Sequence, residues 1–290
     1  MSKPILLALT VFGALVTTGA AAAADHSLNV MSWNIRYDNA GDGANAWKHR
    51  KDWVAEIIQR EKTDLAGFQE VLARQYDDLK ERLPEMAAYG VGRDDGKRAG
   101  EMTPIFYRKS RFKRIDEGTF WLSPTPNKPG SKGWDAAITR ITSWLHLQDR
   151  ETSQEFYVLN AHFDHQGVEA RRESSELIVK RIRKDFADHP VIFLGDLNTT
   201  ADTAAYKSLV SKHDGHATLR DAYEHSAAKP TGPDSTWNGF KKIVPGRRID
   251  HLFTTAAITT KQFRTLDDHR DGKFPSDHLP IIAELQFKPK

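Results

Sequence analysis

Short apolar segments recur along the whole chain, and they constrain its fold more than any other feature. They occupy residues 28–33, 65–68, 104–107, 141–147, 156–159, 191–194, 249–253 and 281–287. Apolar and β-branched runs of this length, bounded by polar residues, are typical of strands buried in a sheet. Because the runs reach from one end of the chain to the other, extensive sheet structure is expected and a helical bundle is excluded.

Helical patterns lie between several of these predicted strands. Apolar residues recur at helical spacing in residues 48–61, 74–83, 169–186 and 203–210. The chain has no internal repeat, and none of its Gly- and Pro-containing loops is long or biased enough to be a linker. The pattern therefore predicts an α/β or α+β fold in a single domain.

Composition removes several classes of protein and of site. With 39% hydrophobic and 28% charged residues, the 290-residue chain is neither fibrous nor disordered. It contains no cysteine, so any metal site must use oxygen or imidazole ligands, and disulfides and cysteine nucleophiles are excluded. A net charge of +3 is too small to require a nucleic-acid partner, although it is compatible with phosphate substrates.

The beginning of the chain has the order of a secretory signal peptide. Lys3 precedes an apolar run over residues 5–16, and small residues follow. This order predicts a signal peptide over residues 1–24, an exported protein that is periplasmic or secreted, and a mature domain over residues 25–290. A membrane anchor or a buried strand is the alternative, but the run is shorter than the roughly 20 residues of a membrane-spanning helix. No later stretch is apolar enough to span a bilayer.

Polar side chains stand at one end of most of the predicted strands, after the strand in some cases and at or before its beginning in others. They are Asn34, Glu70, His162, Asp196, Asn198, Asp250, Asp277 and His278. Strand ends hold functional groups in place while the loops leave room for a ligand, so these side chains are expected to share one site. Taken singly, an Asn or Asp after a strand is more often a turn former, and a lone histidine more often a structural residue. Together they supply the oxygen ligands, base and donors that a hard divalent cation and a phosphate ester require.

The segments around these residues resemble the motifs of one large family. They read Ser-Trp-Asn-Ile-Arg, Phe-Gln-Glu-Val, Asn-Ala-His-Phe-Asp, Gly-Asp-Leu-Asn, Arg-Ile-Asp-His and Ser-Asp-His-Leu-Pro. Their order and content resemble the endonuclease/exonuclease/phosphatase superfamily of metal-dependent phosphoesterases over residues 28–287, and in particular an exported bacterial branch of it. The resemblance implies a four-layer αββα sandwich, in which two mostly antiparallel sheets are flanked by helices and the site lies at one edge.

The resemblance also implies a metal site and an attacking water. Glu70 resembles the principal Mg²⁺ ligand of the family, with Asn34 and Asp277 beside it. Mn²⁺ is a plausible substitute for Mg²⁺, because both ions take carboxylate, amide and water oxygens. Asp196 would then activate or orient the attacking water, and Asn198 would hold the phosphate or that water.

Two histidines and an arginine complete the implied set. His278 resembles the histidine that a carboxylate, here Asp250, orients toward the phosphate. His162 lies where some branches of the family place the general acid for the leaving oxygen, and Glu101 resembles its orienting carboxylate. Arg140 is a candidate phosphate clamp.

The implied substrate is a phosphoester whose identity the sequence leaves open. Hydrolysis of a phosphodiester is the favoured activity, and hydrolysis of sugar or inositol monophosphates is the alternative. Nucleic acid is compatible with the charge but not required, because the basic residues 180–184 are better explained as a solvated helix face. Trp237, in a loop near a motif, is a candidate wall for a substrate pocket. A metal-binding module without catalysis is disfavoured because the motif set has no gap, and the sequence indicates no oligomeric state.

The signal-peptide prediction has a direct test. Protein recovered from the envelope of the native host is expected to begin near Asp25, because a signal peptidase cuts after the small residues that precede it. N-terminal sequencing and intact mass measure this start. Recovery of the envelope protein with Met1 in place would contradict export by cleavage.

Overall fold

The computed structural model describes residues 26–213 and 215–289. Its strands are β1 (Leu28–Asn34), β2 (Leu65–Gln69), β3 (Met86–Tyr89), β4 (Ile105–Arg108), β5 (Phe112–Trp121), β6 (Ile141–Asp149), β7 (Glu155–His162), β8 (Val191–Asp196), β9 (Lys212–His213), β10 (His216–Ala217), β11 (Arg220–Asp221), β12 (Asp250–Thr254), β13 (Ile258–Thr265) and β14 (Ile281–Phe287). Its helices are α1 (Lys51–Arg60), α2 (Ala73–Arg82), α3 (Val168–Asp185) and α4 (Ala204–Leu209), with 3-10 helices η1 (Ala40–Asn45) and η2 (Trp47–His49). The predicted signal peptide, residues 1–24, lies outside the described residues and stays a prediction.

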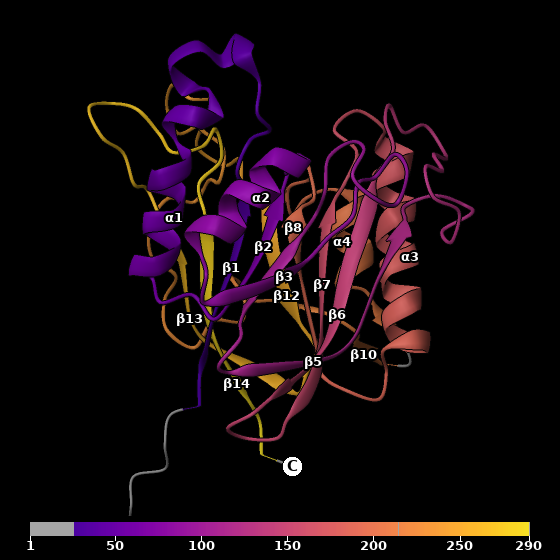
Figure 1. The fold of residues 1–290 in the computed structure, drawn as a ribbon. Helices are drawn as coiled ribbons and strands as arrows, with labels where there is room; N and C mark the ends of the chain where they lie inside the picture. The colour runs from indigo at the N-terminus through magenta and orange to yellow at the C-terminus, as the bar shows by residue number, and fades with distance from the viewer. Residues whose placement is uncertain (1–25, 214, 290) are drawn as a thin grey trace, which may run out of the picture.

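Two six-stranded sheets pack face to face at the centre of the molecule (Figure 1). The first sheet has the strand order β13-β14-β1-β2-β4-β3, and the second has the order β11-β12-β8-β7-β6-β5. Each sheet is antiparallel except for one central parallel pair, β1 with β2 in the first and β7 with β8 in the second. The predicted sandwich of two mostly antiparallel sheets is therefore confirmed.

Helices cover the outer face of each sheet, which completes four layers. Buried residues of α1 and α2, such as Ile57 and Leu79, pack with Phe68 and Phe106 of the first sheet. In the same way α3 and α4 pack on the second sheet, and a third cluster fills the space between the sheets. Among the described residues, no helix combines the length and the apolar character needed to cross a membrane.

The two parallel pairs decide where the polar strand ends meet. The chain passes from β1 to β2 through α1 and from β7 to β8 through α3, as parallel neighbours require a crossover. Parallel strands end at the same edge, so Asn34 and Gln69 are register partners at the end of the first pair, and His162 and Asp196 are partners at the end of the second. The face-to-face packing of the sheets then brings these two ends together.

A buried amide ties the sheets together directly beneath this edge. The Nδ2 atom of Asn160, in β7, donates to the carbonyl oxygens of Phe68 and Pro104, both at 2.9 Å, and its Oδ1 accepts from Gln69 Nε2 at 2.7 Å. A Cβ atom on Gly67 would lie 2.7 Å from the Asn160 Cγ atom, so glycine is needed for this close approach.

The sequence predicts the central strands of both sheets but not the strands at the sheet edges. All eight predicted strands are present, and the predicted helix over residues 48–61 is divided into η2 and α1. The main strands that the sequence did not predict, β3, β5, β11 and β13, are the outermost strands of the two sheets. An edge strand such as β5 carries exposed charged residues, because one of its sides faces solvent, and this hides the apolar pattern.

Loss of the Asn160 amide should weaken the packing of the two sheets. We expect Asn160→Ala to lower the free energy of unfolding by about 3 kcal/mol, because it leaves buried carbonyl and amide groups without partners. Urea unfolding followed by circular dichroism measures the change. The matched control Asn127→Ala, at an exposed position, should change stability by less than about 0.5 kcal/mol. Equal effects of the two substitutions would contradict the bridging role of Asn160.

Candidate active site

Asn34 connects the two halves of the site. Its Nδ2 atom donates to Glu70 Oε1 at 3.0 Å and to Asp196 Oδ2 at 2.9 Å, so one buried amide bridges a residue that follows the first sheet's parallel pair and one that ends the second. The Oδ1 atom of Asn34 accepts from the backbone N–H of Arg36 at 3.0 Å. These contacts fix the amide with its oxygen on the side of Arg36.

Glu70 and Asp277 lie on either side of one arginine. Glu70 follows β2 with a φ of 62°, in the left-handed region, and its Oε2 accepts from the backbone N–H of Tyr37 at 3.1 Å. Arg36 Nη1 lies 3.8 Å from Glu70 Oε2, and Arg36 Nε lies 4.0 Å from Asp277 Oδ2. Burial raises the pKa of Asp277, and the nearby Glu70 carboxylate contributes to the rise. The two carboxylates therefore form a concentrated negative charge that Arg36 only partly offsets.

Buried donors hold the loops that carry these groups. Arg50 Nη1 donates to the carbonyl oxygens of Ile35 at 2.8 Å and Pro275 at 2.7 Å. Ser276 Oγ donates to the carbonyl oxygen of Asn34 at 2.7 Å. The segment after β1 and the segment before β14 are thus fixed to one another, although they are far apart in the sequence.

A histidine lies between two buried aspartates. Asp250 and Asp196 are register partners on β12 and β8. His278 Nδ1 lies 2.8 Å from Asp250 Oδ2, and its Nε2 lies 3.8 Å from Asp196 Oδ2. Burial alone would lower the pKa of His278, but the Asp250 and Asp196 carboxylates raise it well above the ordinary value. The two carboxylates therefore favour the protonated form of His278, which offsets part of their charge.

Asp196 has the proton affinity of a base that works near neutral pH. Burial raises its pKa to about 7, and repulsion from Asp250 adds to the rise. Its Oδ1 accepts from the backbone N–H of Asn198 at 2.9 Å, and His162 Nε2 lies 3.4 Å from its Oδ2. Asn198 Nδ2 in turn lies 3.2 Å from His162 Nε2. Asp196, Asn198 and His162 thus form one contact group.

Two arginines surround His162. Burial lowers the pKa of His162 well below its ordinary value, and the cations of Arg140 and Arg93 lower it further. The Oε2 atom of Glu101 lies 3.8 Å from His162 Nδ1, beyond hydrogen-bond distance, but only 2.8 Å from Arg93 Nη1. The structure thus brings Glu101 to His162 but pairs it with Arg93, whose role the sequence did not indicate.

Arg140 is buried with unused donors. Its Nη2 atom lies 3.1 Å from His165 Nδ1, whereas Nε and Nη1 make no hydrogen bond within the described protein. Asp164 positions the Arg140 loop by accepting from the backbone N–H groups of Ala137 and Ile138. Burial would raise the pKa of Asp164, but these and two further backbone donors hold it at about 2. Asp164 therefore stays ionised beside Arg140.

The donor set fits a hard divalent cation. Four carboxylates meet at this edge, those of Glu70, Asp277, Asp196 and Asp250, and one buried oxygen of Asp250 has no hydrogen-bond partner. Asp196, Asp250 and His278 also have donor atoms within 4.8 Å of one another. Glu70 and Asp277 supply oxygens alone, as a hard divalent cation prefers, and are the better candidate set, with the amide of Asn34 beside them.

The aromatic side chains near the motifs have different roles. Trp47 and Trp121 are buried, and their indole N–H groups donate to Asp78 Oδ2 and to the carbonyl oxygen of Arg93. Trp237 is half-buried, lies beside His278 through an isolated β-bridge, and has the Arg247 guanidinium 4.5 Å from its ring centre. Trp237 is therefore the aromatic residue among these three that can contact a substrate.

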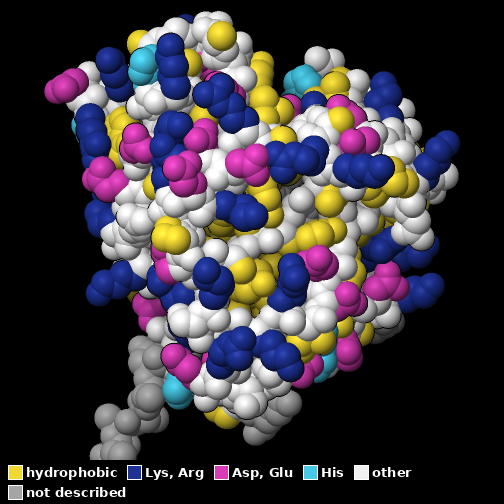
Figure 2. Space-filling view, viewed as in Figure 1, with side chains coloured by type: hydrophobic (Ala, Val, Ile, Leu, Met, Phe, Trp, Pro, Cys, Tyr) yellow, Lys and Arg dark blue, Asp and Glu magenta, His cyan; other side chains and the backbone are white. Residues whose placement is uncertain are grey.

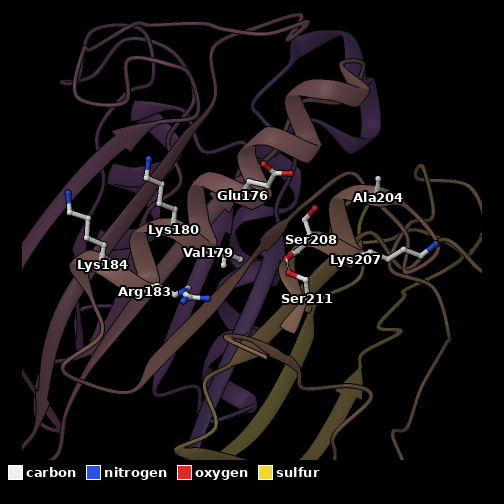
Figure 3. Close-up of a pocket in the computed structure, with 9 residues that line it drawn as sticks. All are labelled: Glu176, Val179, Lys180, Arg183, Lys184, Ala204, Lys207, Ser208 and Ser211. Carbon is white, nitrogen blue, oxygen red and sulfur yellow. Dashed lines mark hydrogen bonds between the residues drawn. The ribbon is translucent and has the colours of Figure 1, made fainter. Parts of the chain in front are cut away.

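A larger hollow lies away from this chemistry, between α3 and α4 (Figure 3). It has a volume of about 940 Å³ and contains none of the predicted site residues. Lys180 and Lys184 on its rim are exposed, and Figure 3 shows their amino groups pointing away from α4. An assignment of the active site from cavity volume alone would therefore select the wrong part of the molecule.

Four residues of the site were given no role by sequence reasoning: Arg36, Arg50, Arg93 and Asp164. Arg36 and Asp164 stand inside quoted motifs, so their position next to Asn34 and His162 was an available signal. Arg50 and Arg93 lie outside every motif, and only the fold brings them to the site.

Comparison with known proteins shows the family to which this chain belongs. Residues 31–278 match the Endonuclease/Exonuclease/phosphatase family. A solved endonuclease/exonuclease/phosphatase structure from Bacteroides vulgatus is 38% identical and has a TM-score of 0.86, covering 90% of this chain and 99% of that chain. A mannosyl-6-phosphatase from Bacteroides thetaiotaomicron is also 38% identical, with a TM-score of 0.83 over 90% of this chain and 100% of that chain.

A more distant similarity is to a nuclease. The 3'-5'-exoribonuclease subunit Ccr4 of the CCR4-Not complex of Mycosarcoma maydis is 27% identical, and the match covers 92% of this chain but only 51% of that protein. The family match spans most of the chain and includes every strand end that meets at the site. This chain therefore belongs to the endonuclease/exonuclease/phosphatase family and is a metal-dependent phosphoesterase.

Proposed function

We propose that this chain is an exported, Mg²⁺- or Mn²⁺-dependent phosphatase that hydrolyses a sugar phosphate. One observation carries the choice of a monoester: Arg140 is buried beside His162 with Nε and Nη1 groups that no protein acceptor uses, and the half-buried Arg93, paired with Glu101, adds a second cation. These arginines line, with Glu101 and His162, a cavity of about 10 Å³, which has room for about one oxygen atom. Two such cations suit the dianion of a phosphomonoester better than the single charge of a diester.

The choice departs from the diester that the sequence favoured. The similarity to a mannosyl-6-phosphatase at 38% identity supports the sugar phosphate, whereas the similarity to an exoribonuclease subunit is 27%. On the face shown in Figure 2, Lys and Arg side chains are interspersed with Asp and Glu rather than gathered in a stripe. A long nucleic acid is normally bound by a basic stripe, so a small substrate is the better match. The export part of the proposal rests on the predicted signal peptide alone.

The residues divide into a water side and a leaving-group side. When bound at Glu70 and Asp277, beside Asn34, the cation would polarise the phosphoryl oxygens and offset their repulsion of the attacking water. Asp196 takes a proton from that water while its oxygen attacks phosphorus, and Asn198 holds a phosphoryl oxygen. His278, kept protonated by Asp250, donates to the phosphate.

His162 serves the leaving sugar oxygen. In the free chain the cations of Arg93 and Arg140 add to the effect of burial and keep His162 neutral. A phosphate dianion placed beside these arginines offsets their charge, so the pKa of His162 rises and the ring can hold a proton. As the bond between phosphorus and the sugar oxygen breaks, His162 gives that proton to the sugar oxygen. Trp237 beside His278 supplies an apolar wall against which a sugar ring can pack.

Paired substrates test the proposed function. In Mg²⁺ or Mn²⁺ the mature chain is expected to hydrolyse the monoesters mannose 6-phosphate and p-nitrophenyl phosphate at least about 100-fold faster than the diester bis(p-nitrophenyl) phosphate. The reason is that the two arginines bind a phosphate dianion more strongly than a monoanion. Chelation should abolish the activity. Steady-state kinetics of phosphate and nitrophenol release measure these rates, and a preference for the diester would contradict the proposal in favour of a phosphodiesterase.

Removal of the base should stop turnover without loss of the fold. We expect Asp196→Asn to lower kcat by about 10³-fold, since an amide cannot take the proton of the attacking water. The control Asp202→Asn, at an exposed position six residues along the chain, should keep the parent rate. Circular dichroism reports the fold of both variants. A purified Asp196→Asn protein that turns over at the parent rate would rule out the proposed base.

The proposed acid can be recognised from the leaving group. His162→Ala should slow hydrolysis of mannose 6-phosphate more than hydrolysis of p-nitrophenyl phosphate, because a sugar oxygen needs a proton to leave and a nitrophenolate does not. Comparison of kcat for the two substrates in variant and parent measures this difference. Equal losses on both substrates would assign His162 to phosphate binding instead.

A further inference from the structure

Two histidines and a glutamate meet at the end of the second sheet that lies opposite the active site. His146 is in β6, Glu155 begins β7, and His189 lies just before β8. Strand β7 runs from Glu155 to His162 over eight residues, which corresponds to a separation of about 23 Å at the rise of a strand. The cluster is therefore separate from the site described above, and none of the three residues takes part in the proposed reaction.

The ligand atoms of this cluster have the spacing of a metal site. His146 Nε2 lies 3.1 Å from Glu155 Oε2, and His189 Nε2 lies 3.4 Å from the same oxygen. All three donor atoms lie within 4.8 Å of one another. Ligands placed at about 2.1 Å around a tetrahedral Zn²⁺ are about 3.4 Å apart, so the two separations from Glu155 Oε2 need little change on binding.

The contacts do not form an ordinary hydrogen-bonded ion pair. His146 Nε2 is buried and makes no hydrogen bond, although the Glu155 oxygen lies 3.1 Å away. The His146 ring nitrogen therefore does not point at the Glu155 oxygen. This orientation is expected when both atoms are directed at a cation that would lie between them. A buried ring nitrogen without a partner is costly, and a cation would satisfy it.

Neighbouring side chains hold two of the three ligands in place. The ring of His146 stacks on that of Tyr157 with centres 4.4 Å apart and an interplanar angle of 27°. Gln148 Nε2 donates to Glu155 Oε1 at 3.3 Å, which leaves Oε2 to face the histidines. Support of this kind orients metal ligands before the metal binds.

The geometry points to a second metal site at His146, Glu155 and His189, which takes a transition-metal cation of the Zn²⁺ class. Two imidazoles and one carboxylate suit Zn²⁺, whereas Mg²⁺ prefers oxygen ligands only. Asp188 Oδ2, 3.4 Å from His189 Nε2, can supply a fourth ligand. Because the ligands come from β6, from β7 and from the segment before β8, a bound ion would fasten these three parts of the chain together.

Zinc binding in excess Mg²⁺ tests the site. The full mature chain is dialysed against Zn²⁺ with Mg²⁺ present to occupy oxygen sites, and bound zinc is counted by elemental analysis. His189→Ala, which removes a half-buried ligand, is expected to hold one Zn²⁺ per chain fewer than the parent. Glu155→Gln should weaken zinc binding by at least about tenfold. The control His269→Ala, at an exposed histidine outside the cluster, should bind as the parent does.

A second readout separates this site from the catalytic one. Co²⁺ in the cluster should give the strong visible absorption of tetrahedral coordination, present in Asp196→Asn and lost in His189→Ala. Mg²⁺-dependent phosphatase activity should be the same in His189→Ala and in the parent. Equal zinc content and an unchanged cobalt spectrum in His189→Ala would overturn the second site and leave the proposed function untouched.

Discussion

The structure depends on the burial of several carboxylates at the edge where its two sheets meet. Asp196 and Asp250 are both buried and face one another in register on neighbouring strands, so the Asp250 carboxylate makes ionisation of Asp196 more costly. Burial and this repulsion raise the pKa of Asp196 to about 7. Protonated His278 offsets part of this charge, and Arg36 offsets part of the charge of Glu70 and Asp277. A divalent cation bound at Glu70, as proposed, would offset the charge that remains.

The fold supplies the rigidity that such a charged site requires. Each sheet contributes one parallel pair whose ends meet at the site, and the amides of Asn34 and Asn160 bind one sheet to the other. Like charges held this close would otherwise separate or take up water. Holding these charged groups close together also prepares the site for binding. Their mutual repulsion lowers the stability of the free protein, and a bound cation and phosphate would relieve it.

Much of the fold could be predicted from the sequence, for a physical reason. The central strands are buried on both faces and therefore form plain apolar runs, and all eight predicted strands are present. The edge strands β3, β5, β11 and β13 are partly exposed, so their sequences mix charged and apolar residues. An apolar pattern reports burial, and it fails where burial is incomplete.

The site divides in a similar way. Residues at strand ends, such as Glu70 and Asp196, are found from the sequence because an apolar run marks the strand before them. Arg93 comes from a loop, where Trp121 Nε1 donates to its carbonyl oxygen and Glu101 pairs with its side chain, which places it near His162. Contacts of this kind join distant segments and leave no periodic signal in the sequence.

The position of the bound metal tests most directly the claim that Glu70 holds the catalytic cation. In Mn²⁺-soaked crystals, anomalous diffraction should show an ion within about 2.3 Å of a Glu70 carboxylate oxygen. An ion bound by Asp196, Asp250 and His278, with none at Glu70, would contradict it.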